Sequence, residues 1–289
     1  MHGAQALILM AAMAAAGPVR FSGESALEWT RKLTALGPRP VDSPAHRNMQ
    51  QMIVKQLRAY GCEVEQDIFT AKTPLGPRRM NNIIAKVRGT SGKLVVFSGH
   101  YDTKLFSDIN FVGANDGGAS AALLIELSRV LCGRPSGHDV YLVWFDGEEA
   151  LVNWTDEDSL YGSRRLARRW SMDGTLKRLV ALINVDMIGD KDLKILNDQT
   201  STPSLRELVW QTATELGYAQ HFLTTPGAIT DDHHPFLQMG ARALDLIDFD
   251  YGPSNSYWHT ERDTVDKLSP RSFQVVGEVL LRALRKLEK

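Results

Sequence analysis

The sequence predicts an α/β fold, a three-layer α/β/α sandwich around a central mixed, mostly parallel β-sheet. Several short segments are apolar at almost every position, which is typical of strands that helices cover on both faces. Segments with helical periodicity, about 10 to 15 residues long, alternate with these strands along the chain. The chain has 289 residues and is 43% hydrophobic, enough to build a large core.

Residues 1–20 form an apolar segment that we separate from the rest of the chain. Within it, Ala4 to Ala16 (AQALILMAAMAAA) has the length of the core of an export signal, although no Lys or Arg precedes it. The run is too short to cross a bilayer as a helix. Two interpretations stay open, a remnant of an export signal and an extra ordered helix. The run favours secretion or the periplasm, with the cytoplasm as the alternative.

We expect residues 21–289 to form a single catalytic domain, because no linker, repeat or low-complexity tract divides them. Two helices come first. One covers Glu24–Leu36 and stops at Gly37, where a glycine and a proline follow the last apolar position. The other begins after Ser43, a favourable cap that precedes a proline, and ends near Tyr60.

Strand character begins at Cys62. Val64, Ile68 and Asn82–Val87 predict an antiparallel hairpin around a turn at Pro74–Pro77, and therefore one antiparallel edge of the sheet. The expected central strands are Lys93–Ser98, Asp139–Phe145, Val180–Val185 and Ala243–Ile247, and the expected connecting helices are Ala119–Cys132, Leu160–Arg169, Leu205–Leu216 and Phe273–Leu287.

Overall charge gives no reason to expect an anionic partner. Lys and Arg total 33 against 34 for Asp and Glu, so we expect neither nucleic acid nor a membrane as a partner. Cys62 and Cys132 lack the spacing of metal ligands and are interpreted as two buried free thiols. A disulfide between them stays open, because sequence alone supplies no geometry.

Acidic and histidine residues follow the central strands. In such sheets ligands bind beyond the carboxyl ends of the strands, so these side chains should converge there. Packed carboxylates cost several kcal/mol unless a cation or a proton compensates them. Asp, Glu and His without cysteine form the ligand set of a catalytic zinc site with one open position. The converging residues are His100 and Asp102, Asp116, Glu148 and Glu149, Asp186, and His259.

These residues resemble the zinc aminopeptidase clan, and longer strings resemble its glutaminyl cyclase branch, the glutaminyl-peptide cyclotransferases. The strings are HYDTK from His100, FDGEEA from Phe145 with Trp154 after it, DSLYGSR from Asp158, DDHHPFL from Asp231, and WHT from Trp258. They occur in a consistent order over more than nine-tenths of the chain, from about Phe21 onward.

The resemblance implies a zinc-dependent acyltransferase that converts the N-terminal glutamine of peptides and proteins to pyroglutamate and releases ammonia. Asp116, Glu149 and His259 are then the ligands of one zinc ion. The alternative is a two-zinc aminopeptidase of the same clan, in which His100 and Asp186 complete a second site. All five possible ligands are present, so a site with two zinc ions remains an alternative.

The cyclase interpretation also assigns roles to other side chains. Glu148 moves a proton from the attacking amine to the departing ammonia. Asp186 and Asp231 share a hydrogen bond and orient the substrate. Trp154, Thr230 and Trp258 line the substrate pocket, and His100 with Asp102 is either a hydrogen-bonded structural pair or a second-metal pair, of which we favour the first.

Some positions depart from the animal members of the family. Thr230 stands where they carry Gln, and Gly99 and Ala121 stand where they place a disulfide, so that bridge is absent. The polar loop Asp248–Tyr257 is longer, which implies a different pocket mouth. These departures are typical of a bacterial member, for which we expect a monomer.

Overall fold

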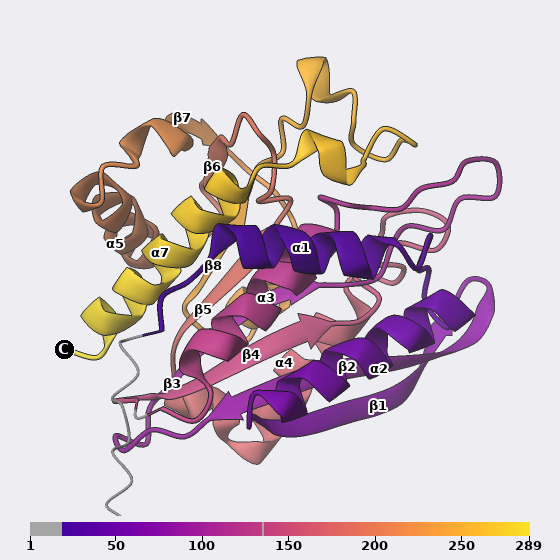
Figure 1. Cartoon of the computed structure of the whole chain (residues 1–289). Coiled ribbons are helices and arrows are strands. Elements are labelled where there is room, and N and C mark those ends of the chain that lie inside the picture. The colour runs from indigo at the N-terminus through magenta and orange to yellow at the C-terminus, as the bar shows by residue number, and fades with distance from the viewer. Residues whose placement is uncertain (1–18, 135) are drawn as a thin grey trace, which may run out of the picture.

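The computed structural model describes residues 19–134 and 136–289, and the expected apolar segment at residues 4–16 lies outside them. A six-stranded sheet in the order β1-β2-β4-β3-β5-β8 forms the centre (Figure 1). Strands β4, β3, β5 and β8 run parallel, whereas β1 and β2 pair antiparallel with their neighbours. The expected mixed, mostly parallel sheet with one antiparallel edge is therefore confirmed.

The strands and helices have the following bounds. The strands are β1 Glu63–Thr73, β2 Gly76–Val87, β3 Leu94–His100, β4 Asp139–Phe145, β5 Leu179–Asp186, β6 Ile195–Asp198, β7 Phe222–Gly227 and β8 Ala243–Ile247. The α-helices are α1 Gly23–Thr34, α2 Pro44–Ala59, α3 Gly118–Leu131, α4 Tyr161–Asp173, α5 Pro203–Glu215, α6 His234–Gln238 and α7 Pro270–Leu287. Short 3-10 helices cover Thr175–Arg178, Ala219–His221, Pro253–Asn255 and Val265–Lys267.

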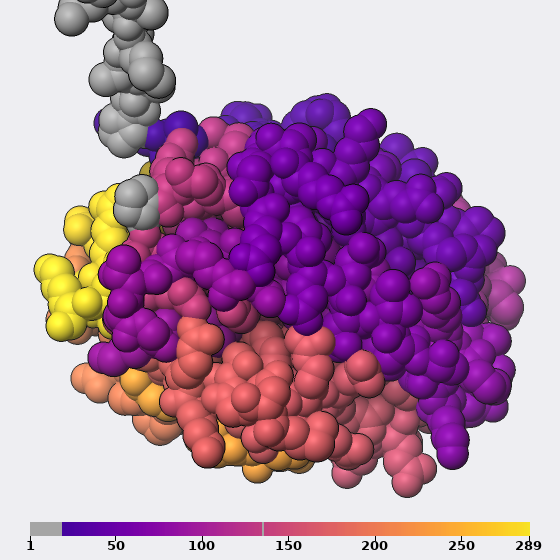
Figure 2. Space-filling model, turned by 90° about the horizontal axis from the view of Figure 1, so that it is seen from below, coloured from indigo at the N-terminus to yellow at the C-terminus, as the bar shows by residue number. Residues whose placement is uncertain are grey.

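Side chains of the central strands alternate between two hydrophobic cores, as the pleat of a strand requires. On β3, Val95 and Phe97 pack into the core under α1, α2, α3, α5 and α7. Leu94 and Val96 pack on the opposite face, with Trp170 of α4 and residues of α6. The sheet is thus the middle of three layers, as expected. Figure 2 shows the C-terminal residues of α7 at one edge of the molecule, while the N-terminal part covers much of the same view.

Two features were not expected. A second, two-stranded parallel sheet joins β6 to β7, and α6 follows it. The two strands have four and six residues, and most of β7 is half-buried or exposed. Because neither strand carries the continuous apolar pattern of the central sheet, the sequence does not distinguish them from loop.

The interpretation of the two cysteines as free thiols is wrong. Cys62 follows α2 and Cys132 follows α3, and the two form a disulfide with their Cα atoms 5.1 Å apart. Helices α2 and α3 contact each other, which brings together two cysteines that are 70 positions apart in sequence. Among the helices of the described residues, none is both long and apolar enough to cross a bilayer.

Candidate active site at the carboxyl edge of the sheet

The turns after the central strands bring the expected residues to one edge of the sheet. His100 ends β3 and Asp186 ends β5, while Glu148 and Glu149 follow β4 after Gly147. Gly147 has φ +68°, a left-handed conformation that a side chain disfavours, and an added Cβ would lie 2.8 Å from the sulfur of Met80. This tight turn directs the Glu148-Glu149 pair away from the strand.

The three expected metal ligands converge on one point. His259 Nε2 lies 3.2 Å from Asp116 Oδ2 and 3.0 Å from Glu149 Oε1, and the three ligand atoms all lie within 4.8 Å of one another. One imidazole nitrogen and two carboxylate oxygens form the donor set of a catalytic zinc site. The residues therefore fit the ion.

The backbone and neighbouring rings hold His259 in place. Its φ is +54°, a left-handed conformation that is uncommon for a residue with a side chain. The imidazole stacks on Trp258, with ring centres 4.1 Å apart, and it packs against Phe106 and Phe111 in edge-to-face contacts. Burial disfavours its charged form, but hydrogen bonds with Asp116 and Glu149 raise the pKa of His259 to about 10.

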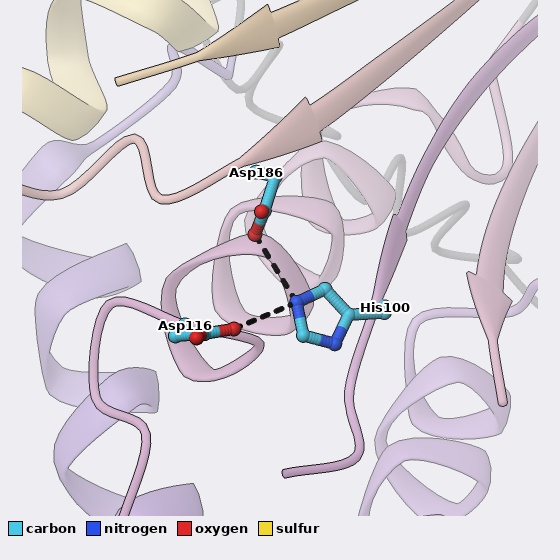
Figure 3. Close-up of side chains that lie close together, drawn as sticks. All are labelled: His100, Asp116 and Asp186. Atoms are coloured by element: carbon cyan, nitrogen blue, oxygen red, sulfur yellow. Dashed lines mark hydrogen bonds and ion pairs between the residues drawn. The ribbon is translucent and has the colours of Figure 1, made fainter. Parts of the chain in front are cut away.

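A second cluster shares Asp116 with the first (Figure 3). His100 Nε2 lies 3.2 Å from Asp116 Oδ1 and 3.1 Å from Asp186 Oδ1, and these three residues could also hold a metal ion. The two oxygens of Asp116 therefore face different imidazoles. Burial opposes ionisation of Asp116, yet hydrogen bonds from His100 and His259 hold its pKa below the usual range.

Glu148 lies beside the ligands and is buried. Burial raises the pKa of Glu148 well above its usual value, with His100 opposing the rise and Glu149 and Asp231 adding to it. Its backbone position depends on Asp102, whose carboxylate accepts hydrogen bonds from the backbone N–H groups of Gly147, Glu148 and Glu149 at 3.1, 3.2 and 3.3 Å. Asp102 therefore supports the turn that presents Glu148.

A cavity of about 380 Å³ opens over these groups. It is large enough for one amino-acid side chain and its amine. Its walls include all nine residues to which we assigned a ligand, catalytic or pocket role: Asp116, Glu148, Glu149, Trp154, Asp186, Thr230, Asp231, Trp258 and His259. Trp154 is 46% exposed, so this tryptophan is not part of the hydrophobic core.

Two expected contacts are not formed in the described part of the chain. Asp186 pairs with His100 rather than sharing a hydrogen bond with Asp231, because an imidazole is a better partner for a carboxylate than a second acid. Burial raises the pKa of Asp186 to about 7, with His100 opposing the rise and Asp231 adding to it. His100 Nδ1 lies 3.6 Å from Asp102 Oδ1, which is beyond hydrogen-bond distance. The prediction of a hydrogen bond between these two side chains is therefore wrong.

Sequence reasoning missed two residues that support the ligands. Asp263 accepts hydrogen bonds from the backbone N–H groups of Asn115 and Asp116 at 2.8 and 3.1 Å and so joins the His259 loop to the Asp116 turn. Lys104 donates to the carbonyl oxygen of Ala150 and lies 3.6 Å from Glu149 Oε2. Asp263 follows no strand, so the strand-end rule could not find it, whereas Lys104 lies inside the HYDTK string and was given no role.

The chain is similar to known proteins along most of its length. The family model of peptidase family M28 matches residues 82–284. The glutaminyl-peptide cyclotransferase of Drosophila melanogaster is 31% identical over 252 residues, which cover 78% of this chain and 70% of that protein. The crystal structure of an Acidobacteriales bacterium glutaminyl cyclase superposes with a TM-score of 0.90 at 42% identity, covering 96% of this chain and 99% of that one. Porphyromonas gingivalis glutaminyl cyclase gives a TM-score of 0.83 at 30% identity, covering 92% and 98%.

The fold and the site define a member of peptidase family M28, and the chain belongs to that family. Within the family, the three relatives named above, at 30 to 42% identity, are glutaminyl cyclases, so the chain belongs to this branch and is an enzyme of the cyclase type.

Proposed function

We propose that the protein is a zinc-dependent glutaminyl-peptide cyclotransferase, which converts the N-terminal glutamine of peptides and proteins to pyroglutamate and releases ammonia. The observation that carries the proposal is the meeting of Asp116, Glu149 and His259 at one wall of the cavity, with the carboxyl group of Glu148 beside them. These three residues would hold the zinc ion at the wall of the cavity, where a substrate can reach it.

Asp116, Glu149 and His259 would hold a zinc ion, which would act as a Lewis acid toward the γ-carbonyl oxygen of the glutamine side chain. The α-amino group of the same residue attacks the γ-carbon, which closes a five-membered ring as the bond to the amide nitrogen breaks. Because nucleophile and electrophile belong to one molecule, the protein must mainly hold them in the reactive orientation.

Glu148 carries the proton in this reaction. It accepts a proton from the attacking amine and donates it to the departing nitrogen, which leaves as ammonia. A general acid–base works best when its pKa is close to the working pH, and burial shifts the pKa of Glu148 in that direction. Asp102 holds the backbone of Glu148 and thereby supports this role.

The remaining walls of the cavity orient the glutamine. Asp231 and Asp186 are acceptors for the substrate amine, and Trp154 and Trp258 enclose the aliphatic part of the side chain. Thr230 contributes a hydroxyl or backbone group at the same wall. We propose one zinc ion for this reaction, with His100 hydrogen-bonded to Asp186 and Asp116.

The test combines metal analysis with two assays on one purified sample. A peptide with N-terminal glutamine should release ammonia and lose 17 Da, whereas leucine amide should release no free leucine. Zinc should be present at one ion per chain, and activity should disappear with a chelator and return with zinc. An active sample without bound zinc, or a zinc-loaded sample that leaves glutaminyl peptides unchanged, would refute the proposal.

One observation favours a second candidate, the two-zinc aminopeptidase. His100, Asp116 and Asp186 form a second set of three possible ligands, and Asp116 directs one oxygen toward each set. Two zinc ions per active chain, together with release of leucine from its amide, would favour this candidate over the cyclase.

We also propose that the protein works in an oxidising compartment outside the cytoplasm. The Cys62–Cys132 disulfide supports this location, since disulfides persist in secreted and periplasmic proteins and are rare in the cytosol. Fractionation of the source cells, with the redox state of both cysteines trapped by alkylation, tests the proposal. Reduced thiols in a cytosolic fraction would contradict it.

A further inference from the structure

Asp198 is a buried carboxylate for which the proposed reaction has no role. It is the last residue of β6, and its side chain is fully enclosed. In the small parallel sheet, Asp198 pairs with Gly227, the last residue of β7. The loop 228–233, which carries Thr230 and Asp231 into the cavity wall, begins directly after Gly227.

The carboxylate first binds its own turn. Oδ1 accepts the backbone N–H of Thr200 at 3.0 Å, and Oδ2 accepts the backbone N–H of Ser201 at 2.9 Å. The hydroxyl groups of the same two residues lie 2.7 Å and 2.5 Å from Oδ2. These bonds give a buried charge the donors that it needs.

The same carboxylate and turn also hold both ends of the loop. At the near end, the Ile229 N–H donates to Asp198 Oδ1 at 3.3 Å. At the far end, His233 Nε2 lies 3.5 Å from Asp198 Oδ2 and 3.0 Å from the Thr200 hydroxyl oxygen. The Thr200 hydroxyl is also 3.1 Å from the Ile229 carbonyl oxygen. Thr230, Asp231 and Asp232 therefore lie between two anchored points.

The charge state of Asp198 agrees with this network. Burial alone would raise its pKa, but His233, Ser201 and Thr200 hold the pKa of Asp198 below the usual range. Asp198 is therefore ionised at neutral pH, and a charged acceptor forms stronger hydrogen bonds than a neutral one.

We infer that Asp198 is a positioning residue, which fixes the loop 228–233 so that Asp231 and Thr230 stand at the correct distance from the substrate amine. The inference rests on the proposed function, because it assumes that Asp231 contacts the substrate. Asp198 itself lies outside the cavity and acts only through the loop. A displacement of about 1 Å in such a group can cost up to roughly 10²-fold in rate.

The test uses Asp198→Asn, which keeps the shape and removes the charge, and Thr200→Val, which removes only the linking hydroxyl. The matched control is Asp139→Asn. Asp139 is also a buried carboxylate, bound by the Gly89 N–H and by Arg178, but it begins β4, at the opposite end of that strand from Glu148. The measurements are kcat and KM on a glutaminyl peptide, zinc content, and hydrogen exchange of the segment 226–234.

Asp198→Asn and Thr200→Val should each lower kcat/KM by roughly 10-fold or more with zinc content unchanged, and should increase exchange mainly in residues 226–234. Asp139→Asn should change neither kcat/KM nor the hydrogen exchange of residues 226–234. In an Asp231→Asn background, Asp198→Asn should cost little further activity, because a residue that acts through Asp231 has no additional effect once Asp231 is neutral.

Three results would overturn the inference: unchanged exchange and activity in both variants, an equal loss of activity with and without Asp231, or increased exchange spread evenly over the chain. The proposed function fails separately. If the wild-type protein does not cyclise glutaminyl peptides, or if Asp231→Asn retains full turnover, the proposed role of Asp231 is wrong. Hydrogen exchange of the 226–234 segment then decides by itself whether Asp198 holds the loop.

Discussion

Reduction of the Cys62–Cys132 disulfide should lower the stability of the protein substantially while leaving the active site intact. The two cysteines are 70 residues apart in sequence. A crosslink over a loop of that length removes conformational entropy from the unfolded chain equivalent to about 4 kcal/mol at 25 °C. For a chain of this size, each kcal/mol corresponds to roughly 2 °C, so the melting temperature should fall by about 8 °C.

Turnover at 25 °C should change little, because Cys132 follows the end of α3 whereas Asp116 precedes its start. Both cysteines are buried, so the reduced thiols should retain most of their apolar packing. The assay is thermal unfolding with and without a phosphine reductant, which avoids the zinc chelation that dithiols cause. The Cys62→Ala/Cys132→Ala variant is the control, and its melting temperature should not respond to the reductant.

The reasoning would be refuted by a wild-type melting temperature that the reductant does not change. Two free thiols titrated in denatured, unreduced protein would refute it as well, since they would show that the crosslink is absent. A loss of turnover as large as the loss of stability would contradict the expected independence of the disulfide and the active site.

Four further predictions concern the site and its support. Glu148→Gln should keep zinc and lose roughly 10²-fold or more in kcat, because the variant cannot transfer a proton; near-normal turnover in steady-state assays would remove Glu148 from that role. His259→Ala should lose zinc and activity together, as measured by metal analysis of the dialysed protein, and a fully loaded variant would contradict the ligand assignment. Trp154→Ala should raise KM roughly fivefold, which corresponds to about 1 kcal/mol of lost contact with the substrate. The melting temperature should not change, because the side chain is largely exposed. An unchanged KM would place Trp154 outside the substrate site. The stabilisation that the Asp198 carboxylate contributes should be fully present above its unfolded pKa of about 3.9, and it should disappear as the pH falls through its lower folded pKa. The melting temperatures of wild type and Asp198→Asn should therefore converge below about pH 4. A constant difference between them down to pH 3 would contradict this.

The central sheet and the convergence at its edge could be predicted because both follow from local pattern. β4 and β8 have the expected bounds, since continuous apolar runs flanked by polar turns define buried strands. Ligands bind beyond the carboxyl ends of parallel strands, and this rule predicts that His100, Glu149 and Asp186 converge even when the detailed fold is unknown.

The features that were missed depend on distances between segments far apart in sequence. The cysteine pair is joined because α2 and α3 pack together. Asp186 pairs with His100 rather than Asp231 because β3 and β5 are neighbours in the sheet. Strands β6 and β7 lack an apolar repeat, so the support that Asp198 gives to the Asp231 loop has no local signal.

The three proposed zinc ligands are distributed unevenly along the chain, and this has a consequence for biosynthesis. Asp116 and Glu149 leave the ribosome well before His259, which lies in the loop between β8 and α7. In a growing chain these three residues cannot come together until β8, the last strand of the sheet, is in place. Ligands that are still far apart bind an ion weakly. Metal binding should therefore be a late event that follows synthesis of β8 and of the loop that carries His259, and a chain truncated before His259 should purify as an apoprotein.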